Sequence, residues 1–271
     1  MRTAIHFIAA SLASLAFSAC SDNLTPPAAI EPPAVFDCVP DRDGAITAAE
    51  LPVALDLAVD YAVSTDIAVD LVGTGAADAH RWDLSEERND PIVAVAAAPL
   101  NAQWYASSFP GAAFVVDAGG GLDGIYRKDD TALWLYGLAS HDAAPAAGKT
   151  LLPYATPVAV LRFPIVDGDA HHEVGEITAG TAQGLPFIGT DTYDVDVTGT
   201  GRLDLPYVRF SPVLRVRTHV VRAPAAGGTS IGKRQVQFLF ECFGEITRAE
   251  SRPDEANPDF TTAASLRRYS L

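Results

Sequence analysis

The chain has 271 residues, with 19 basic and 34 acidic side chains and a formal net charge of −15. The electrostatic field of such a negatively charged protein repels nucleic acid and anionic lipid surfaces. Because no basic cluster offsets this field, the composition excludes a nucleic-acid-binding protein. The length suffices for one large β domain or two small ones.

The first twenty residues carry an export signal. One cation, Arg2, precedes an apolar run that ends in small residues against Cys20. A membrane-spanning helix needs about 20 apolar residues, so this run is too short, and the polar Ser21 follows at once. The sequence predicts a signal peptide over residues 1–19 that is removed from the mature protein.

The segment Leu15-Ala-Phe-Ser-Ala-Cys20 resembles the lipobox of bacterial lipoproteins. The resemblance implies that Cys20 is acylated, becomes the new N-terminus and holds the protein to a membrane of the cell envelope. The outer membrane is favoured over the inner one because Ser21, and not an aspartate, follows the cysteine. The alternative is an ordinary secretory peptide cleaved near Ala19, which leaves Cys20 as a free thiol or a disulfide partner.

Residues 20–36 are predicted to form a lipidated cysteine and a proline-rich tether. The tether contains four prolines and little that could build a core. Proline-rich chain extends by about 3.1 Å per residue, so the tether spans about 50 Å. Residues 37–271 are predicted to form a single β-rich domain.

The chain contains three cysteines. If Cys20 carries lipid, Cys38 and Cys242 remain as an even pair in an oxidising compartment, and the sequence predicts a disulfide between them. The alternative is two buried thiols, because free cysteines are often buried.

The segment from Asp41 to Glu50 resembles the calcium loop of an EF-hand. Asp41, Asp43 and the closing Glu50 would supply carboxylate ligands, but the first ligand position holds Val39, which has no side-chain oxygen. The favoured interpretation is therefore purely structural: Thr47 and Glu50 have the spacing of a capping box. No cofactor is expected, and a weak calcium site is the alternative.

From Val53 to Ser64 apolar residues recur with a period of two, which is typical of a half-buried strand. Similar stretches, separated by turn residues, are predicted as strands at 67–71, 112–117, 131–138, 157–163, 192–198, 213–221 and 235–247. The last two are predicted to pair, and residues 261–270 are predicted to form a short helix. The pattern predicts an all-β fold, either an antiparallel β-sandwich or an open β-barrel with short helical turns at its edges.

Two segments approach nucleotide-binding motifs but lack the helix that such motifs need. Residues 119–124 have dinucleotide-binding spacing, yet a turn and a strand follow them, so they are predicted to form a β turn. Residues 143–150 resemble a P-loop, but Pro145 stiffens the loop and Pro153 opposes the helix.

Three further features of the sequence have favoured structural explanations. Ser230 lies in a Gly-x-Ser-x-Gly pattern, but the residues after it alternate as a strand, so an esterase using Ser230 is an unfavoured alternative. His171 and His172 are adjacent and would point to opposite faces of a strand, so an exposed turn is favoured over a metal site. The pair Arg267-Arg268 is predicted to be solvated surface charge.

Residues 80–248 resemble an uncharacterised class of exported bacterial β-sheet proteins. The segments that carry the resemblance are Trp82–Ser85, Phe109–Ala112, Leu135–Leu138, Pro157–Pro164 and Val213–Arg217. The resemblance implies export and a β fold, without an assigned activity.

The sequence thus favours a membrane-anchored lipoprotein with a non-catalytic binding or structural role, and not an enzyme. Its predicted partners are the membrane, through the N-terminal lipid, and an unknown envelope protein or an apolar ligand. A carrier of apolar ligands or lipids at the cell envelope is the alternative from a different class, because the apolar strand faces could line a cavity.

Overall fold

The computed structural model describes residues 38–76 and 80–271, so the predicted signal peptide, Cys20 and the tether lie outside the described residues. The fold is all-β, as predicted. Its strands are β1 (Ala45–Ile46), β2 (Ala58–Ala68), β3 (Arg81–Asp83), β4 (Ile92–Ala96), β5 (Ala98–Pro99), β6 (Phe114–Gly119), β7 (Leu122–Lys128), β8 (Ala132–Ser140), β9 (Leu151–Arg162), β10 (Ile165–Val166), β11 (Ala170–Ala182), β12 (Leu185–Leu205), β13 (Val208–Pro224), β14 (Ile231–Phe240), β15 (Gly244–Glu250) and β16 (Thr262–Tyr269). Short 3₁₀ turns, Leu100–Ala102 and Ala106–Ser108, stand at the edge of the sheet. No helix in these ranges is long and apolar enough to cross a membrane.

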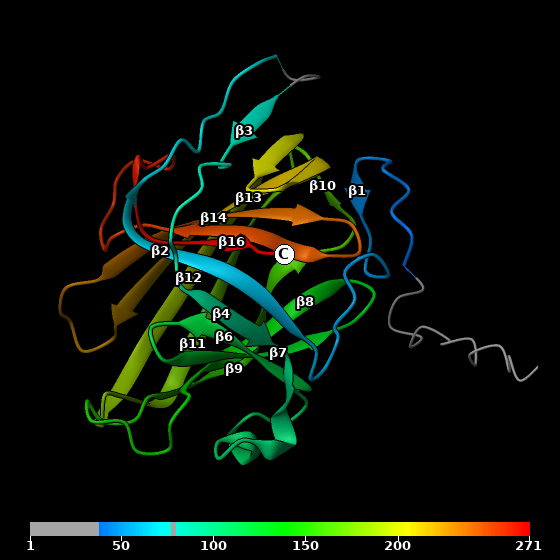
Figure 1. Cartoon of the computed structure of the whole chain (residues 1–271). Coiled ribbons are helices and arrows are strands. Elements are labelled where there is room, and N and C mark those ends of the chain that lie inside the picture. The colour runs from blue at the N-terminus through cyan, green and yellow to red at the C-terminus, as the bar shows by residue number, and fades with distance from the viewer. Residues whose placement is uncertain (1–37, 77–79) are drawn as a thin grey trace, which may run out of the picture. The chain divides into compact units, whose positions relative to one another are not determined.

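The strands form a nearly closed antiparallel barrel (Figure 1). Neighbouring strands follow the order β4-β2-β16-β15-β14-β13-β12-β11-β9-β8-β7-β6-β5, and β3 pairs in parallel with β12 beside this path. The two end strands, β4 and β5, are separated in the chain by Ala97 alone. The ring of hydrogen bonds is therefore interrupted at one seam, where the chain itself continues from one end strand to the other.

The predicted pairing of residues 213–221 with 235–247 is confirmed by β13 and β14. The second stretch is divided, however, by a turn at Cys242, whose φ of 67° is left-handed, so β14 and β15 form a hairpin. The predicted terminal helix at 261–270 is wrong: this segment is β16, held between β15 and β2. The strand expected from Val53 begins only at Ala58.

The interior core of the barrel is built from alternate residues of strands around the ring. Its buried members include Leu152, Ile177, Val195, Val216 and Leu239, which come from five different strands. Their side chains point to one face of each strand, as the period of two requires. Burial of such residues is worth about 1.5–3 kcal/mol each relative to exposure, so this core is a main source of stability.

Other apolar residues pack on the outside of the barrel beneath covering segments. Trp82 and Phe260 lie in segments outside the ring and pack with Phe238 of β14 and Leu266 of β16. The Trp82 and Phe238 ring centroids are 5.0 Å apart. Part of the sheet is therefore buried on both faces.

Charged side chains in the interior are paired with one another. Glu245 stands opposite Leu239 of the interior core, lies 3.7 Å from Arg248 and accepts a 2.6 Å hydrogen bond from Arg267 Nε. Burial opposes ionisation of Glu245, but the two guanidinium groups outweigh it and lower the pKa of this carboxyl.

A second interior network surrounds Asp191, which has no exposed surface. Its carboxylate accepts bonds of 2.7 and 2.6 Å from Arg222 and one of 2.8 Å from the Tyr154 hydroxyl. The Tyr154 and Tyr193 hydroxyls are 2.6 Å apart, and burial is the main cause that raises the pKa of both tyrosines. The polar side chains around Asp191 therefore form a hydrogen-bonded layer within the lumen.

Candidate cation site at the barrel mouth

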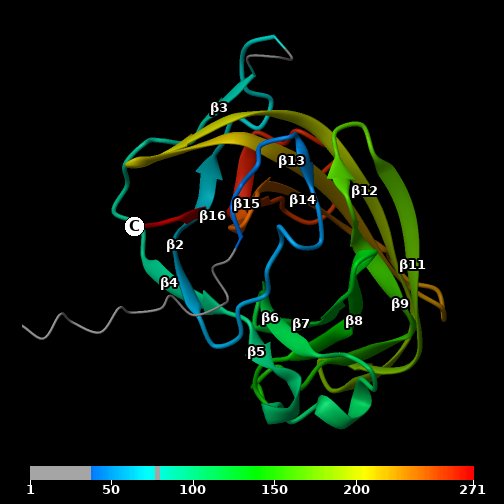
Figure 2. The ribbon, with the colours of Figure 1, turned by 90° about the vertical axis from the view of Figure 1, so that its right-hand side faces the viewer.

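The N-terminal plug, residues 38–52, lies across one mouth of the barrel (Figure 2). Its strand β1 pairs with β10, where Ile46 stands opposite Ile165, and Ile46 and Leu51 are buried in the interior core. On the far side the backbone N–H of Cys242 donates a 2.7 Å hydrogen bond to the Glu50 carbonyl oxygen. The plug therefore closes the apolar end of the lumen with its own side chains.

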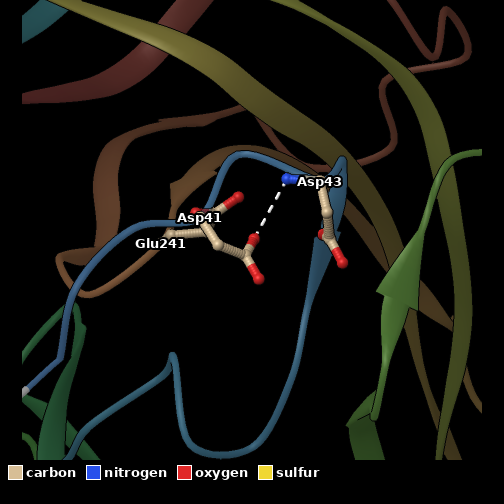
Figure 3. A group of neighbouring side chains, drawn as sticks. All are labelled: Asp41, Asp43 and Glu241. Carbon is tan, nitrogen blue, oxygen red and sulfur yellow. Dashed lines mark hydrogen bonds between the residues drawn. The ribbon is translucent and has the colours of Figure 1, made fainter.

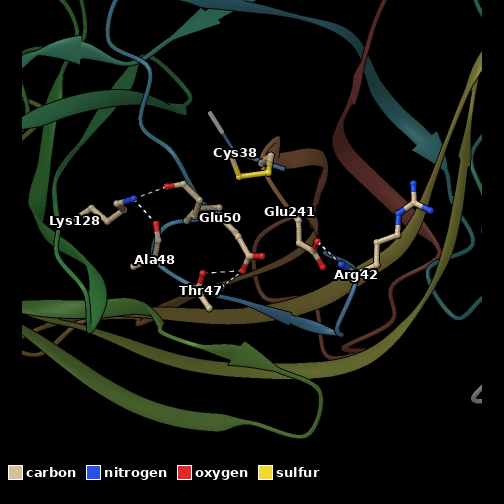
Figure 4. The surroundings of a disulfide bond; sticks show 9 residues. Cys38, Arg42, Thr47, Ala48, Glu50, Lys128 and Glu241 are labelled. Carbon is tan, nitrogen blue, oxygen red and sulfur yellow. Dashed lines mark hydrogen bonds between the residues drawn. A yellow bond between two sulfur atoms is a disulfide. The ribbon is translucent and has the colours of Figure 1, made fainter. Parts of the chain in front are cut away.

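Two further attachments hold the plug (Figure 4). Cys38 and Cys242 form the predicted disulfide, with their Cα atoms 5.5 Å apart. Lys128, at the end of β7, donates hydrogen bonds of 2.6 and 2.7 Å to the carbonyl oxygens of Ala48 and Leu51. Burial lowers the pKa of Lys128, because the charged form of the ammonium group loses hydration there.

Three carboxylates gather beside the disulfide (Figure 3). Asp41, Asp43 and Glu241 each place one oxygen within 4.8 Å of the oxygens of the other two. Oδ1 of Asp41 accepts a 3.0 Å bond from the Asp43 N–H, and Oδ1 of Asp43 accepts a 2.8 Å bond from the Ala45 N–H. These turns fix the direction of both aspartates and leave an oxygen of each for a ligand.

Glu241 is the unusual member of the group, because its side chain is buried and carries no counter-charge. Only 2% of the residue is exposed, and within the described part of the chain no Lys, Arg or His forms an ion pair with it. Its carboxylate accepts a 2.8 Å hydrogen bond from the backbone N–H of Arg42, while the Arg42 guanidinium points away (Figure 4). Burial of a carboxylate without a neighbouring cation raises the free energy of the folded state, so a cation bound here would offset this cost.

The predicted ligand Glu50 is not part of this group. Its Oε2 accepts bonds of 2.9 Å from the Thr47 N–H and 2.8 Å from the Thr47 hydroxyl. The segment thus follows the favoured capping interpretation at Glu50, although it forms a turn and not a helix. Glu241, which the loop pattern could not indicate, occupies the third place, and its only sequence signal is its position next to Cys242.

The donor set suits a hard cation. Calcium binds six to eight oxygens at about 2.3–2.6 Å, and carboxylates supply most of its charge compensation. Three carboxylates, supplemented by backbone oxygens and water, match the weak sites of this class better than the tight ones.

The remaining sequence candidates have structural roles or unsuitable positions. Ser230 is exposed in the connection between β13 and β14, with strand on both sides, so the strand-to-helix turn of a nucleophile elbow is not formed there. The glycine-rich residues 119–124 contain the turn of the β6–β7 hairpin, as predicted. His171 points inward and its Nε2 lies 2.8 Å from the Ala159 carbonyl oxygen, whereas His172 is exposed, as expected for neighbours on a strand. The turn predicted there ends at Asp169, and both histidines lie in β11.

Comparisons with family models, with curated proteins and with solved structures gave no match. The resemblance to exported β-sheet proteins therefore stays a prediction.

Proposed function

We propose that this chain is a lipid-anchored protein of the cell envelope with a non-catalytic binding or structural role, held to the membrane through Cys20. The observation that supports this role is the filled barrel. Its interior is occupied by apolar side chains, by the plug and by the ion-paired groups around Glu245 and Asp191. Contacts with an envelope partner would then use the outer surface of a rigid scaffold.

The alternative function, a carrier of apolar ligands, is less well supported because the interior of the barrel is filled. A carrier site is an apolar cavity with few polar groups. In this barrel a ligand would have to displace the plug or contact buried carboxylate and guanidinium groups, whose pairing offsets the cost of their desolvation. Extraction of the protein in mild detergent followed by mass spectrometry is expected to recover no stoichiometric lipid other than the one bonded to Cys20.

The anchor is tested by the intact mass of the mature protein from its native host. We expect a chain that starts at Cys20 and carries a lipid-sized increment, and a gain of two hydrogens on reduction of the disulfide. A Cys20→Ser variant is the control and should remain unlipidated. A wild-type chain of unmodified mass would contradict the anchor and make the protein a freely secreted one.

Calcium binding at the mouth is a second candidate function, and the uncompensated burial of Glu241 favours it. We expect calcium to raise the midpoint of thermal unfolding. A ligand present at about 100 times its dissociation constant adds about 2.7 kcal/mol to the free energy of unfolding. Glu241→Gln should abolish this response and at the same time stabilise the calcium-free protein, because it removes a buried charge.

The matched control is Glu50→Gln, which removes one carboxylate from the same loop but lies outside the group. It should lose some stability, about 1 kcal/mol for the Thr47 contacts, and keep the full calcium response. An equal calcium-induced shift in Glu241→Gln and wild type would contradict the site.

A further inference from the structure

The end of β12 carries a group of charged side chains on one face of the sheet. Asp204 of β12 stands directly opposite Arg209 of β13 on one side and Asp83 of β3 on the other. Leu203, the neighbour of Asp204, is buried in the apolar cluster that contains Trp82. Since successive residues of a strand point to opposite faces, the charged side chains lie on the face turned away from that cluster.

Three guanidinium groups converge on the carboxylate of Asp204. Nε of Arg81 lies 2.5 Å from Oδ2, Nη2 of Arg202 lies 3.3 Å from the same oxygen, and Nε of Arg209 lies 2.6 Å from Oδ1. The Asp204 side chain is only 7% exposed, whereas those of the three arginines are 41, 36 and 62% exposed. The arginines therefore lie between this carboxylate and the solvent.

The group holds more positive charge than Asp204 needs. Asp191, which has no exposed surface, is compensated by the single guanidinium of Arg222. Burial opposes ionisation of Asp204, but hydrogen bonds from two of its arginines outweigh it and lower the pKa of this carboxyl. Asp83 also pairs with Arg81, at 2.7 Å, so three arginines face two carboxylates and one positive charge is left over. This surplus arises only in the folded chain, because Arg81 is 123 residues from Asp204 in the sequence.

The donors that this pairing leaves free lie on the outer edges of the guanidinium groups. Among the hydrogen bonds of the described residues, Arg209 uses only its Nε, so both of its Nη groups are available. Arg202 has a buried Nε without a hydrogen-bond partner in the same part of the chain, and its Nη2 makes only the long contact to Asp204. The end of a guanidinium group presents two parallel donors, which match two oxygens of a phosphate group.

We propose that Arg81, Arg202 and Arg209 form a binding site for a phosphate group. The ligand contacts the outer edges of the three guanidinium groups and does not replace Asp204. At physiological ionic strength the Debye length is about 8 Å, so the adjacent arginines act on the ligand more strongly than the distant acidic groups of the chain. A soluble phosphate compound and a lipid headgroup share this chemistry.

The probe is inorganic phosphate, titrated calorimetrically into the mature protein at constant ionic strength. We expect one site per chain. Arg209→Gln and Arg202→Gln should each weaken binding about tenfold or more, because each removes charge-assisted hydrogen bonds. Asp204 keeps two guanidinium groups in either variant, so both should fold, and Arg202→Gln, which loses only the 3.3 Å contact, should disturb the fold least.

Arg252→Gln is the matched control. The Arg252 side chain is 63% exposed, against 62% for Arg209, and it also pairs with a carboxylate, that of Asp66, but no second arginine of the described residues forms an ion pair there. Phosphate binding should be unchanged in this variant. The proposal is overturned if wild type binds no phosphate, if Arg209→Gln or Arg202→Gln binds it as wild type does, or if Arg252→Gln loses as much affinity.

Sedimentation with lipid vesicles distinguishes the two sources of the phosphate group. The chain used is Cys20→Ser, so that a lipid anchor contributes nothing, and the vesicles are phosphatidylcholine with phosphatidic acid, whose headgroup is a phosphomonoester. Binding to these vesicles that Arg209→Gln loses identifies a lipid headgroup as the ligand. If calorimetry shows the phosphate site but the chain does not sediment, the ligand is a soluble phosphate compound.

Discussion

Replacing Cys242 with serine is expected to lower the free energy of unfolding by about 2–5 kcal/mol. The bond joins residues separated by 204 positions, and closure of so long a loop restricts the unfolded chain strongly. In the folded protein the same change releases the start of the plug, which then depends on Lys128, on the two-residue strand β1 and on the buried Ile46 and Leu51.

The measurement is equilibrium unfolding in guanidinium chloride, with the midpoint and slope compared between wild type and variant. Cys38→Ser should show the same loss, and the double variant Cys38→Ser with Cys242→Ser should lose no more than either single one, because all three remove one bond. An unchanged midpoint in Cys242→Ser would show that the bond contributes nothing to stability.

Replacing Arg222 with methionine is expected to cost about 3–5 kcal/mol. Methionine retains most of the aliphatic volume but removes the bidentate partner of Asp191, whose carboxylate has no exposed surface. The remaining 2.8 Å bond from the Tyr154 hydroxyl does not compensate a buried charge. The loss therefore comes from the carboxylate left behind and not from the missing arginine itself.

Denaturant unfolding of two variants separates these causes. In Arg222→Met combined with Asp191→Leu, both charges are gone, and most of the stability lost in Arg222→Met should return. If the double variant is as unstable as the single one, the cost lies in packing around Arg222, and the electrostatic explanation is wrong.

Period-two patterning was sufficient to predict the fold class, because a strand such as β12 alternates between buried and less buried residues over much of its length. It failed where polar residues face inward. Arg267 and Arg268 were predicted to be solvated, yet Arg267 pairs with Glu245 in the interior, and Arg268, only 2% exposed, pairs with Asp90 on the other face of β16. Neither acidic partner is a local neighbour in the sequence, so no local pattern could identify these arginines as buried.

The candidate cation site, too, could be predicted only in part from the sequence. Asp41 and Asp43 belong to one short loop, and their spacing indicated a calcium-binding turn. Glu241 is 199 residues from Arg42, whose backbone N–H donates a hydrogen bond to it, and the two segments meet only in the folded protein, beside the disulfide. Glu50, which the calcium-loop pattern selected, instead contacts Thr47, the partner that the capping-box spacing indicated.

The position of the disulfide also decides how the domain carries mechanical load. A pull on the chain before Cys38, as a membrane anchor would exert, passes through the sulfur atoms directly to the turn between β14 and β15. Residues 39–241 lie within a covalently closed loop, so the hydrogen bonds of the plug carry none of this force. After reduction the same pull would act on the plug itself and peel it from the mouth before any strand of the ring was strained.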